Sequence, residues 1–289
     1  MPANANYPLR SWSDTVRWLR EQPGQAELVR DAYYDDPLVD AAERYRSSEE
    51  WREIRSWLPL TPASALDVGA GRGIASYALG KEGFTVTALE PDASSLTGAQ
   101  AIRSLADETA LPITVVEEFS EKLPFPDGSF DLVFTRAVLH HTRDLGRACA
   151  ECFRVLKPGG RFIAIREHVI SRPEDRIVFL DRHPLHKLYG GENAFLLHDY
   201  TQALTAAGFV IRYSLKSFDT PVNYFPYTRD TLRAALLDRI DKTMRASAVV
   251  GPLLKNDILF AAVLRVLSLV DRRPGRLHSF VCDKPAHAQ

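Results

Sequence analysis

Residues 64–73 read SALDVGAGRG, and this stretch decides how the chain folds. Its first half is small and apolar, which predicts a buried strand over residues 65–68. Its second half has glycine at every second position. Glycines let a backbone approach a ligand closely, and the free N–H groups of a following helix can bind that ligand. The stretch therefore predicts a strand, a ligand-binding loop and a helix, in that order.

Strands and helices alternate along the chain on the C-terminal side of this loop. Such alternation predicts an α/β fold, here a doubly wound, Rossmann-like and mostly parallel sheet with helices on both faces. In such sheets ligands bind at the carboxyl ends of the strands. We expect seven strands, over residues 65–68, 84–90, 112–118, 130–136, 161–167, 209–218 and 276–285.

Two helical regions flank or interrupt the predicted core. Residues 1–58 are expected to form a helical cover, and residues 59–218 the Rossmann-like core. The core contains an insertion over 168–198, which we interpret as an ordered substrate lid because it is long and rich in aromatic residues. A helical insertion follows over 219–274, and residues 275–289 return a last strand to the sheet. The apolar helix over 256–270 is expected to be buried or to form a homodimer contact.

Composition excludes several classes of protein. The 289 residues carry a net charge of -1, which gives no electrostatic reason to expect nucleic acid as a partner. No apolar stretch reaches the roughly 18 residues that a membrane span needs. The sequence shows no secretory signal, so a cytoplasmic location is expected. Cys149, Cys152 and Cys282 are too few for a disulfide framework, and Cys149 and Cys152 are interpreted as small core residues.

The chemistry around the glycine loop indicates which ligand it holds. A dinucleotide fingerprint requires glycine where this chain has Ile74, which disfavours an NAD(P)-linked oxidoreductase. Asp67, just before the loop, would repel a diphosphate and attract an ammonium group. Glu90 follows about 20 residues later, where a carboxylate accepts hydrogen bonds from ribose hydroxyls. An ammonium, a ribose and no diphosphate describe S-adenosylmethionine (SAM) better than NAD.

Three motifs in order carry a resemblance to a known family. They are LDVGAGRG (66–73) with Glu90, LPFPDGSFDLVFTRAVLHH (123–141) and RVLKPGGRF (154–162). Together they resemble the class I SAM-dependent methyltransferases, and most closely the type 11 family, which includes enzymes similar to the ubiquinone/menaquinone C-methyltransferases. The resemblance covers roughly residues 60–170. Because this family methylates many small molecules, it implies the fold and cofactor but leaves the acceptor open.

The resemblance also implies which residues bind SAM. The residues near its methionine part would be Asp67, Gly69, Ala70, Gly71 and Gly73, with Thr135 and Arg136 beside the transferred methyl group. Glu90, followed by Pro91, would bind the ribose. Glu118, Phe119 and Ser120 would border the adenine. Many relatives have an aspartate where this chain has Phe119, so the adenine contact is left to Glu118, to a backbone carbonyl or to stacking.

Histidines and a glutamate are predicted at the carboxyl edge of the sheet, where a methyl acceptor would lie. His140 and His141 follow the fourth strand, and Glu167 and His168 follow the fifth. An oxygen acceptor must lose a proton, which a histidine or carboxylate can accept. Two alternatives remain open: one of the histidine pair packs a helix start, or Glu167 and His168 form a surface loop pair.

The predicted lid adds further candidates. His183, His186 and Glu192, together with Glu167 or His168, contain the donor atoms of a divalent metal site. Their spacing matches no standard metal motif, so we expect hydrogen bonds within the loop and no metal. Tyr33 and Tyr34 either cover the cofactor or pack the N-terminal helices against the sheet.

The sequence as a whole predicts a SAM-dependent methyltransferase that acts on a small molecule and releases S-adenosylhomocysteine. The expected acceptor is a hydroxyl oxygen of a sugar, glycan precursor or natural product, with a histidine or glutamate as general base. A C-methyltransferase acting on a quinone-like or polyketide aromatic is the first alternative. A non-catalytic partner subunit with the same fold is the second.

Overall fold

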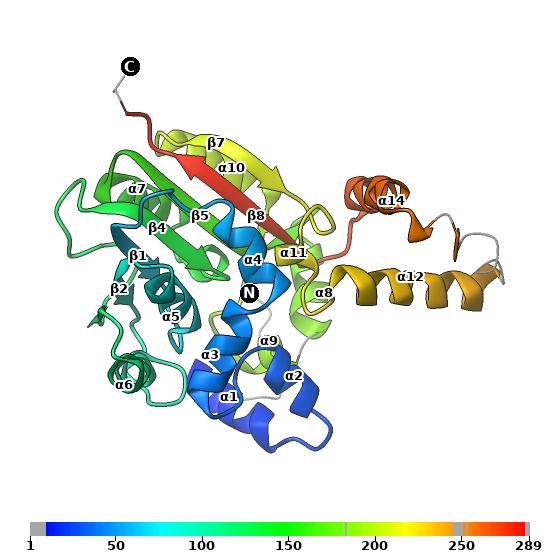
Figure 1. Ribbon diagram of the computed structural model, residues 1–289, viewed down its shortest axis with the longest axis horizontal. Coiled ribbons are helices and arrows are strands. Elements are labelled where there is room, and N and C mark those ends of the chain that lie inside the picture. Colours follow the sequence, from blue (N-terminus) through cyan, green and yellow to red (C-terminus); the bar gives the residue numbers. More distant parts are fainter. Residues whose placement is uncertain (1–9, 183, 245–250, 253, 287–289) are drawn as a thin grey trace.

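The computed structural model describes residues 10–182, 184–244, 251–252 and 254–286. Their central feature is a single eight-stranded sheet in the order β3-β2-β1-β4-β5-β8-β7, with β6 paired to β5 outside this path (Figure 1). The strands are β1 (Ser64–Val68), β2 (Thr85–Leu89), β3 (Ile113–Val116), β4 (Phe130–Arg136), β5 (Leu156–Ile170), β6 (Phe195–Leu196), β7 (Val210–Leu215) and β8 (Arg276–Asp283).

The predicted doubly wound topology is confirmed. Strands β1 to β5 run parallel, while β8 is antiparallel to both β5 and β7. The strand order reverses at β1, which pairs with β2 on one side and with β4 on the other. The carboxyl ends of these three strands therefore form the crevice in which such sheets bind ligands. The eighth strand is the short β6, within the predicted lid.

The fifth strand is longer than predicted. Glu167, the last residue of the predicted strand, and His168, expected after it, both lie inside β5, because β8 extends the pairing: Glu167 lies opposite His278 and His168 opposite Leu277. A register shift between Ala164 and Glu167 interrupts the ladder just before them. Such an irregularity bends a strand and redirects its side chains, which the residue pattern does not reveal.

Helices cover both faces of the sheet. Alternate residues of β4 point to opposite faces, so Val133 and Phe134 belong to different core clusters. The Val133 side is covered by α7 (Leu145–Val155) and α10 (Leu197–Ala206), with Cys149 and Cys152 buried there as predicted and Cys282 of β8 in the same cluster. The Phe134 side is covered by α3 (Leu38–Arg46), α4 (Glu49–Arg55), α5 (Ile74–Lys81) and α11 (Pro221–Tyr224).

The remaining helices belong to the N-terminal cover, the core edge and the lid. They are α1 (Trp12–Glu21), α2 (Ala26–Asp31), α6 (Ala99–Thr109), α8 (Asp175–Arg182) and α9 (Pro184–Leu188). Leu185 of α9 packs with Leu19 and Val29 of the first two helices. The backbone at Arg10 also bridges to Tyr189. The described residues of α9 and Tyr189, within the predicted lid, thus pack against the N-terminal helices.

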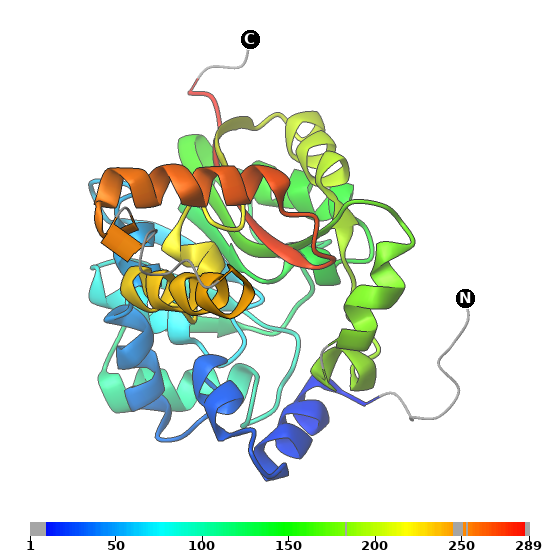
Figure 2. The ribbon, with the colours of Figure 1, turned by 90° about the vertical axis from the view of Figure 1, so that its right-hand side faces the viewer.

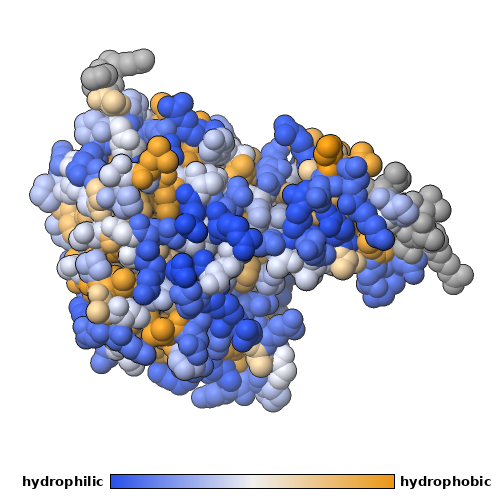
Figure 3. Space-filling view, viewed as in Figure 1, coloured by the Kyte–Doolittle hydropathy of each residue, from blue (hydrophilic) through white to orange (hydrophobic). Residues whose placement is uncertain are grey.

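Helices α12 (Arg229–Met244) and α14 (Asp257–Val270) project from the body of the molecule (Figures 1 and 2). Helix α14 buries Phe260 and Leu264 against α12. Its outer face exposes apolar side chains, part of the hydrophobic surface at the projecting end in Figure 3: Ile258, Leu259, Val266, Leu269 and Val270. No helix among the described residues is both long and apolar enough to cross a membrane.

Candidate active site

The glycine loop has the backbone conformation that its glycines permit. Gly69, Gly71 and Gly73 all have positive φ angles, of 64°, 57° and 84°. Gly73 is the N-cap of α5, so the free N–H groups of that helix lie at the loop. A Cβ atom at Gly69 would lie 2.7 Å from Cγ2 of Val138, just past β4. The loop and the turn after β4 are therefore in direct contact.

Two buried carboxylates flank this loop from adjacent strands. Glu90 accepts hydrogen bonds from the backbone N–H groups of Gly71 at 2.7 Å and Asp92 at 2.9 Å. Asp67 accepts one from Ser76 Oγ at 2.6 Å. Burial raises the pKa of each carboxyl to about 7, although these hydrogen bonds oppose the shift. The structure thus brings together the two acids that the sequence singled out.

The other predicted cofactor residues are more dispersed. Ala70 is buried beside Ile102 of α6, and Pro91 directly follows Glu90. At the end of β3, Glu118 is exposed, the Phe119 side chain is 61% exposed and Ser120 is half-buried. An exposed ring at the crevice edge is compatible with stacking. Whether these residues border an adenine stays a prediction.

Thr135 and Arg136 end β4 on opposite faces. The buried Thr135 Oγ1 atom has no hydrogen-bond partner among the described residues. Arg136 instead pairs with the carboxylate of Glu50 on α4, at 2.8 Å. Its guanidinium group also lies over the rings of Tyr33 and Tyr45. Its charge is therefore already neutralised within the protein.

The two tyrosines of the N-terminal cover have different surroundings. Tyr33 is buried in the core against Tyr45 and Phe225, which is the packing role that the sequence left open. The adjacent Tyr34 accepts a hydrogen bond from the Trp12 indole at 3.1 Å. Arg72 of the glycine loop binds this segment through the carbonyl oxygens of Tyr33 and Asp35 and the Asp36 carboxylate. The cover is thus joined to the loop.

A 3-10 turn after β4, Leu139–His141, is held by the buried Glu167 carboxylate of β5. That carboxylate accepts hydrogen bonds from the backbone N–H groups of Val138, Leu139 and His140 at 3.0 to 3.2 Å. It also lies 2.7 Å from His140 Nδ1. Burial raises the pKa of Glu167 to about 7, and the three backbone N–H groups oppose this. Glu167 therefore positions the turn and orients His140.

The predicted histidines form one cluster. The His140 ring lies 4.2 Å from that of His141 and 4.6 Å from that of His168, between centroids. His168 Nδ1 donates to the Gly275 carbonyl oxygen at 2.9 Å, and His141 Nδ1 to that of Gly191 at 3.2 Å. Burial lowers the pKa of all three, so they are neutral near pH 7.

Two residues of the predicted lid join the cluster. Glu192 lies 3.6 Å from His140 Nε2 through one oxygen and 3.9 Å from His186 Nε2 through the other. The His186 ring lies 5.5 Å from that of His168. Burial raises the pKa of Glu192 to about 8. His183 lies outside the described residues.

Aromatic residues missed by the sequence analysis surround His141. The rings of Trp12 and Tyr189 lie 5.0 Å apart, and those of His141 and Tyr189 lie 5.6 Å apart. The position of Tyr189 directly before Gly190 and Gly191 was the only signal in the sequence that could have singled it out. Together with Tyr34, these residues form an aromatic border next to the histidine cluster.

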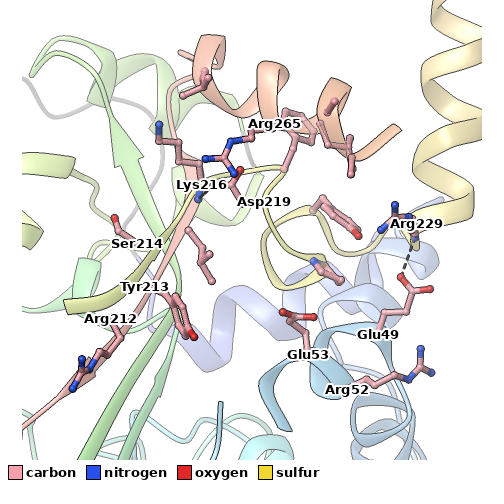
Figure 4. Close-up of a pocket in the computed structure, with 18 residues that line it drawn as sticks. Glu49, Arg52, Glu53, Arg212, Tyr213, Ser214, Lys216, Asp219, Arg229 and Arg265 are labelled. Atoms are coloured by element: carbon pink, nitrogen blue, oxygen red, sulfur yellow. Dashed lines mark hydrogen bonds between the residues drawn. The ribbon is translucent and has the colours of Figure 1, made fainter. Parts of the chain in front are cut away.

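A separate cavity of about 970 Å³ lies elsewhere, between α4, β7, α11 and α14 (Figure 4). Charged side chains of both signs line it, among them Glu49, Glu53, Arg212 and Arg265. None of the residues that line it is one of the predicted site residues. It therefore provides no alternative location for the chemistry described above.

A glycine loop between two acid-bearing parallel strands, in a sheet with an antiparallel β8 beside β5, defines the Rossmann-like methyltransferase fold. A family model described as a methyltransferase domain matches residues 66–164. The predicted resemblance to the SAM-dependent methyltransferases is confirmed over this part of the chain.

Two curated relatives match only part of their own length. The uncharacterized methyltransferase YcgJ of Bacillus subtilis is 29% identical over 50% of this chain and 58% of its own. A ubiquinone biosynthesis O-methyltransferase of Methylobacterium nodulans is 34% identical over 39% of this chain and 44% of its own. The chain thus spans about half the length of these relatives.

Solved structures resemble nearly the whole chain. A putative sarcosine dimethylglycine methyltransferase from Galdieria sulphuraria has a TM-score of 0.58 and 21% identity, over 94% of this chain and 99% of its own. The [4+2]-cyclase SpnF has the same score and identity, over 97% of this chain and 99% of its own. These likenesses confirm the fold. Because one of these structures is named a cyclase, the fold by itself does not establish the reaction.

Proposed function

We propose that the protein is a SAM-dependent methyltransferase that acts on a small molecule. The observation that carries this proposal is the pair Asp67 and Glu90, buried on either side of the glycine loop. Asp67 would attract the ammonium group of SAM, and Glu90 would accept hydrogen bonds from its ribose hydroxyls. Glu90 also accepts a hydrogen bond from the backbone N–H of Gly71, so it shapes the loop that would hold SAM.

A hydroxyl oxygen is the proposed acceptor, and His141 the proposed base. Its Nδ1 donates to Gly191, which leaves a lone pair on Nε2. His141 is half-buried, whereas His140 is almost completely buried, so His141 is the more accessible to a ligand. As the oxygen attacks the methyl carbon, its proton would pass to Nε2. The carbon–sulfur bond would break and the sulfonium would become the neutral thioether of S-adenosylhomocysteine.

The surroundings of His141 indicate the kind of acceptor. Trp12 and Tyr189 offer flat apolar faces with polar edges, which suit a hydroxylated ring. A relative named as an O-methyltransferase supports oxygen as the acceptor atom. Carbon methylation of a quinone-like or polyketide aromatic needs the same proton removal and is the alternative that the test below distinguishes.

The first experiment is calorimetric titration with S-adenosylhomocysteine, with NADH as the control ligand. We expect one site for the former and no heat from the latter. Glu90→Gln should weaken binding by about 10- to 100-fold, because a hydrogen bond to a charged group contributes about 1.5–3 kcal/mol. The matched control is Glu117→Gln, an exposed glutamate paired with Arg103. No binding by the wild type would contradict the proposed cofactor.

The second experiment identifies the acceptor. Protein and methyl-labelled SAM are incubated with hydroxylated sugars, phenols and quinols, and the labelled product is analysed by mass spectrometry and NMR. A new O–CH₃ resonance supports the proposal, and a new C–CH₃ resonance supports the alternative. Binding of S-adenosylhomocysteine with no transfer to any acceptor would favour a non-catalytic partner subunit.

We also propose a homodimer through the outer face of α14. Five apolar side chains of this helix are exposed, which is unusual for a surface without a partner. Light scattering at increasing protein concentration tests this. Val266→Asp should shift a dimer to the monomer, and a wild-type protein that is monomeric at every concentration would exclude it.

A further inference from the structure

We propose that His140, His168 and Glu192 form a binding site for a divalent transition-metal ion of the zinc type. The donor atoms of these three residues lie within 4.8 Å of one another. They come from three separate elements: the turn after β4, strand β5 and the segment after α9. This inference concerns metal binding and does not depend on the proposed methyl transfer.

The first argument is the orientation of the two histidines. His168 Nδ1 lies against the Gly275 carbonyl oxygen, which can only accept a hydrogen bond. Nδ1 must therefore carry the proton, and Nε2 the lone pair. His140 Nδ1 lies 2.7 Å from Glu167, whose carboxylate already accepts three backbone N–H groups and acts throughout as an acceptor. His140 Nε2 therefore also carries a lone pair.

This arrangement is the one that metal-binding histidines show in proteins. The ring nitrogen away from the metal donates to a carboxylate or a backbone carbonyl, which fixes the tautomer and the ring orientation. Here the partner of His140 Nδ1 is the Glu167 carboxylate, and the partner of His168 Nδ1 is the Gly275 carbonyl oxygen. The two rings are thus already oriented as ligands before any ion binds.

The second, independent argument is the Glu192 carboxylate. Its side chain is only 3% exposed, and its buried Oε1 atom has no hydrogen-bond partner among the described residues. Oε1 lies 3.6 Å from His140 Nε2, which is too long for a hydrogen bond whichever of the two atoms carries a proton. Burying a carboxylate oxygen without a hydrogen-bond donor destabilises the fold, and a cation bound between these atoms would remove that destabilisation.

The donor set indicates the class of ion. Two neutral imidazole nitrogens and one carboxylate oxygen suit zinc, manganese, iron or cobalt, whereas magnesium prefers oxygen ligands. Bonds of about 2.0–2.2 Å would require the three atoms to converge to about 3.3–3.5 Å. Small side-chain rotations of Glu192 and His168 would supply this. Three protein ligands also leave a coordination position open.

The location of the cluster indicates which group could fill the open coordination position of the metal ion. His141 is the next residue after His140, and Val138 of the same turn contacts the glycine loop. An ion at the cluster would therefore lie beside the proposed acceptor region. An oxygen of the small-molecule ligand is the group that we expect to complete its coordination.

The test is metal binding by the full-length, tag-free protein after treatment with a chelator. Zn²⁺, Mn²⁺ and Mg²⁺ are titrated separately, and bound metal is measured by equilibrium dialysis and elemental analysis. We expect one Zn²⁺ per chain and no retained Mg²⁺. With Co²⁺ we expect visible absorption bands that report nitrogen coordination. Failure to retain Zn²⁺, Mn²⁺ or Co²⁺ at micromolar protein concentration would overturn the proposal.

Variants assign the ligands. Glu192→Gln and His168→Ala should each weaken Zn²⁺ binding at least 100-fold and abolish the Co²⁺ bands. The matched controls are the exposed residues Glu174 and His198, as Glu174→Gln and His198→Ala, which should retain one ion. If Glu192→Gln binds Zn²⁺ like the wild type, the assigned site is wrong.

Folding and cofactor binding are followed separately. Glu192→Gln keeps the shape of the side chain and removes its charge, so it keeps the proposal testable if His168→Ala does not fold. Its thermal midpoint without metal should be no lower than that of the wild type, because the amide offers His140 Nε2 a donor, and only the wild type should be stabilised by Zn²⁺. Titration with S-adenosylhomocysteine tests the proposed function independently, so either idea can fail while the other stands.

Discussion

Arg136 and Glu50 form a bidentate ion pair that joins the end of β4 to the first turn of α4. The distances are 2.8 Å from Nε to Oε1 and 3.2 Å from Nη2 to Oε2. The Glu50 side chain is completely buried, and Arg166 of β5 lies 3.8 Å from it. Two arginines on adjacent strands thus share one carboxylate of the N-terminal cover, which holds that cover on the sheet beside the candidate site.

Replacing Glu50 should therefore strongly destabilise the fold. Glu50→Ala leaves two arginines, whose side chains are only 18% and 16% exposed, without their counter-charge, and breaking such a pair costs about 3–5 kcal/mol. Urea unfolding measures this change in the free energy of unfolding. The control is Asp14→Asn, which breaks an ion pair with Arg17 whose side chains are 55% and 59% exposed. It should cost less than about 1 kcal/mol. If the two variants lose the same free energy of unfolding, the buried pair contributes no more to stability than an exposed one.

The contact between Gly69 and Val138 predicts a second outcome. Gly69→Ala places a methyl group at a positive φ and 2.7 Å from Val138 Cγ2, so the glycine loop must move. We expect loss of stability together with at least tenfold weaker binding of S-adenosylhomocysteine. Calorimetry and thermal unfolding measure the two effects.

The matched control is Gly24→Ala. Gly24 also has a positive φ, of 76°, but a Cβ there would meet nothing within 4 Å. It should show only the backbone cost, about 1–2 kcal/mol, with unchanged ligand affinity. Val138→Ala should partly restore binding to Gly69→Ala because it removes the clashing methyl groups. Without any rescue, the clash would not be the cause.

The pH dependence of cofactor binding follows from Asp67 and Glu90. Burial raises the pKa of both to about 7, so the free protein holds them largely protonated at pH 6 and ionised at pH 8. Binding an ammonium group and ribose hydroxyls favours the ionised forms. The affinity for S-adenosylhomocysteine should therefore fall roughly tenfold for each group as pH falls from 8 to 6. Titration in buffers of different ionisation heat should show proton release below pH 7.

The same two groups affect folding with a defined sign. Their pKa values are raised above those of the unfolded chain, so between about pH 4 and 7 the folded state binds more protons. The free energy of unfolding should fall as pH rises through this window. Asp67→Asn should remove the part of this pH dependence that Asp67 contributes. The stability of the variant relative to the wild type should therefore be higher at pH 8 than at pH 5. An unchanged pH profile would show that Asp67 titrates normally.

The proposed base predicts a kinetic result. His141→Ala should lower kcat about 10²- to 10⁴-fold, which is the usual contribution of a general base, without changing the affinity for S-adenosylhomocysteine. Turnover is measured with an acceptor found by the screen described above. His198→Ala, at an exposed position on α10, is the control and should retain full activity. If His141→Ala loses cofactor affinity instead, the residue supports the loop rather than the reaction.

Much of the fold could be predicted because its signals are local. The apolar run at 65–68, the glycines after it and the recurring strand and helix patterns each depend on neighbours in sequence. Asp67 and Glu90 could be placed for the same reason, since each lies at or next to the last residue of a predicted strand. The core positions of Cys149 and Cys152 also followed from helical periodicity.

Other features depended on pairings between distant segments. The extension of β5 to Ile170 arises from its ladder with β8, so His168 could not be placed inside a strand in advance. The roles of Trp12 and Tyr189 depend on the packing of α9 against α1, which no local pattern specifies.

The sequence by itself determined the sheet, the glycine loop and the two acids beside it, because these follow from periodicity and from chain order at strand ends. Only the tertiary structure decided that Arg136 pairs with Glu50, and that His140, His168 and Glu192 converge. The physical reason is that buried charges and lone pairs must find partners in space, and those partners lie on elements far apart in the chain.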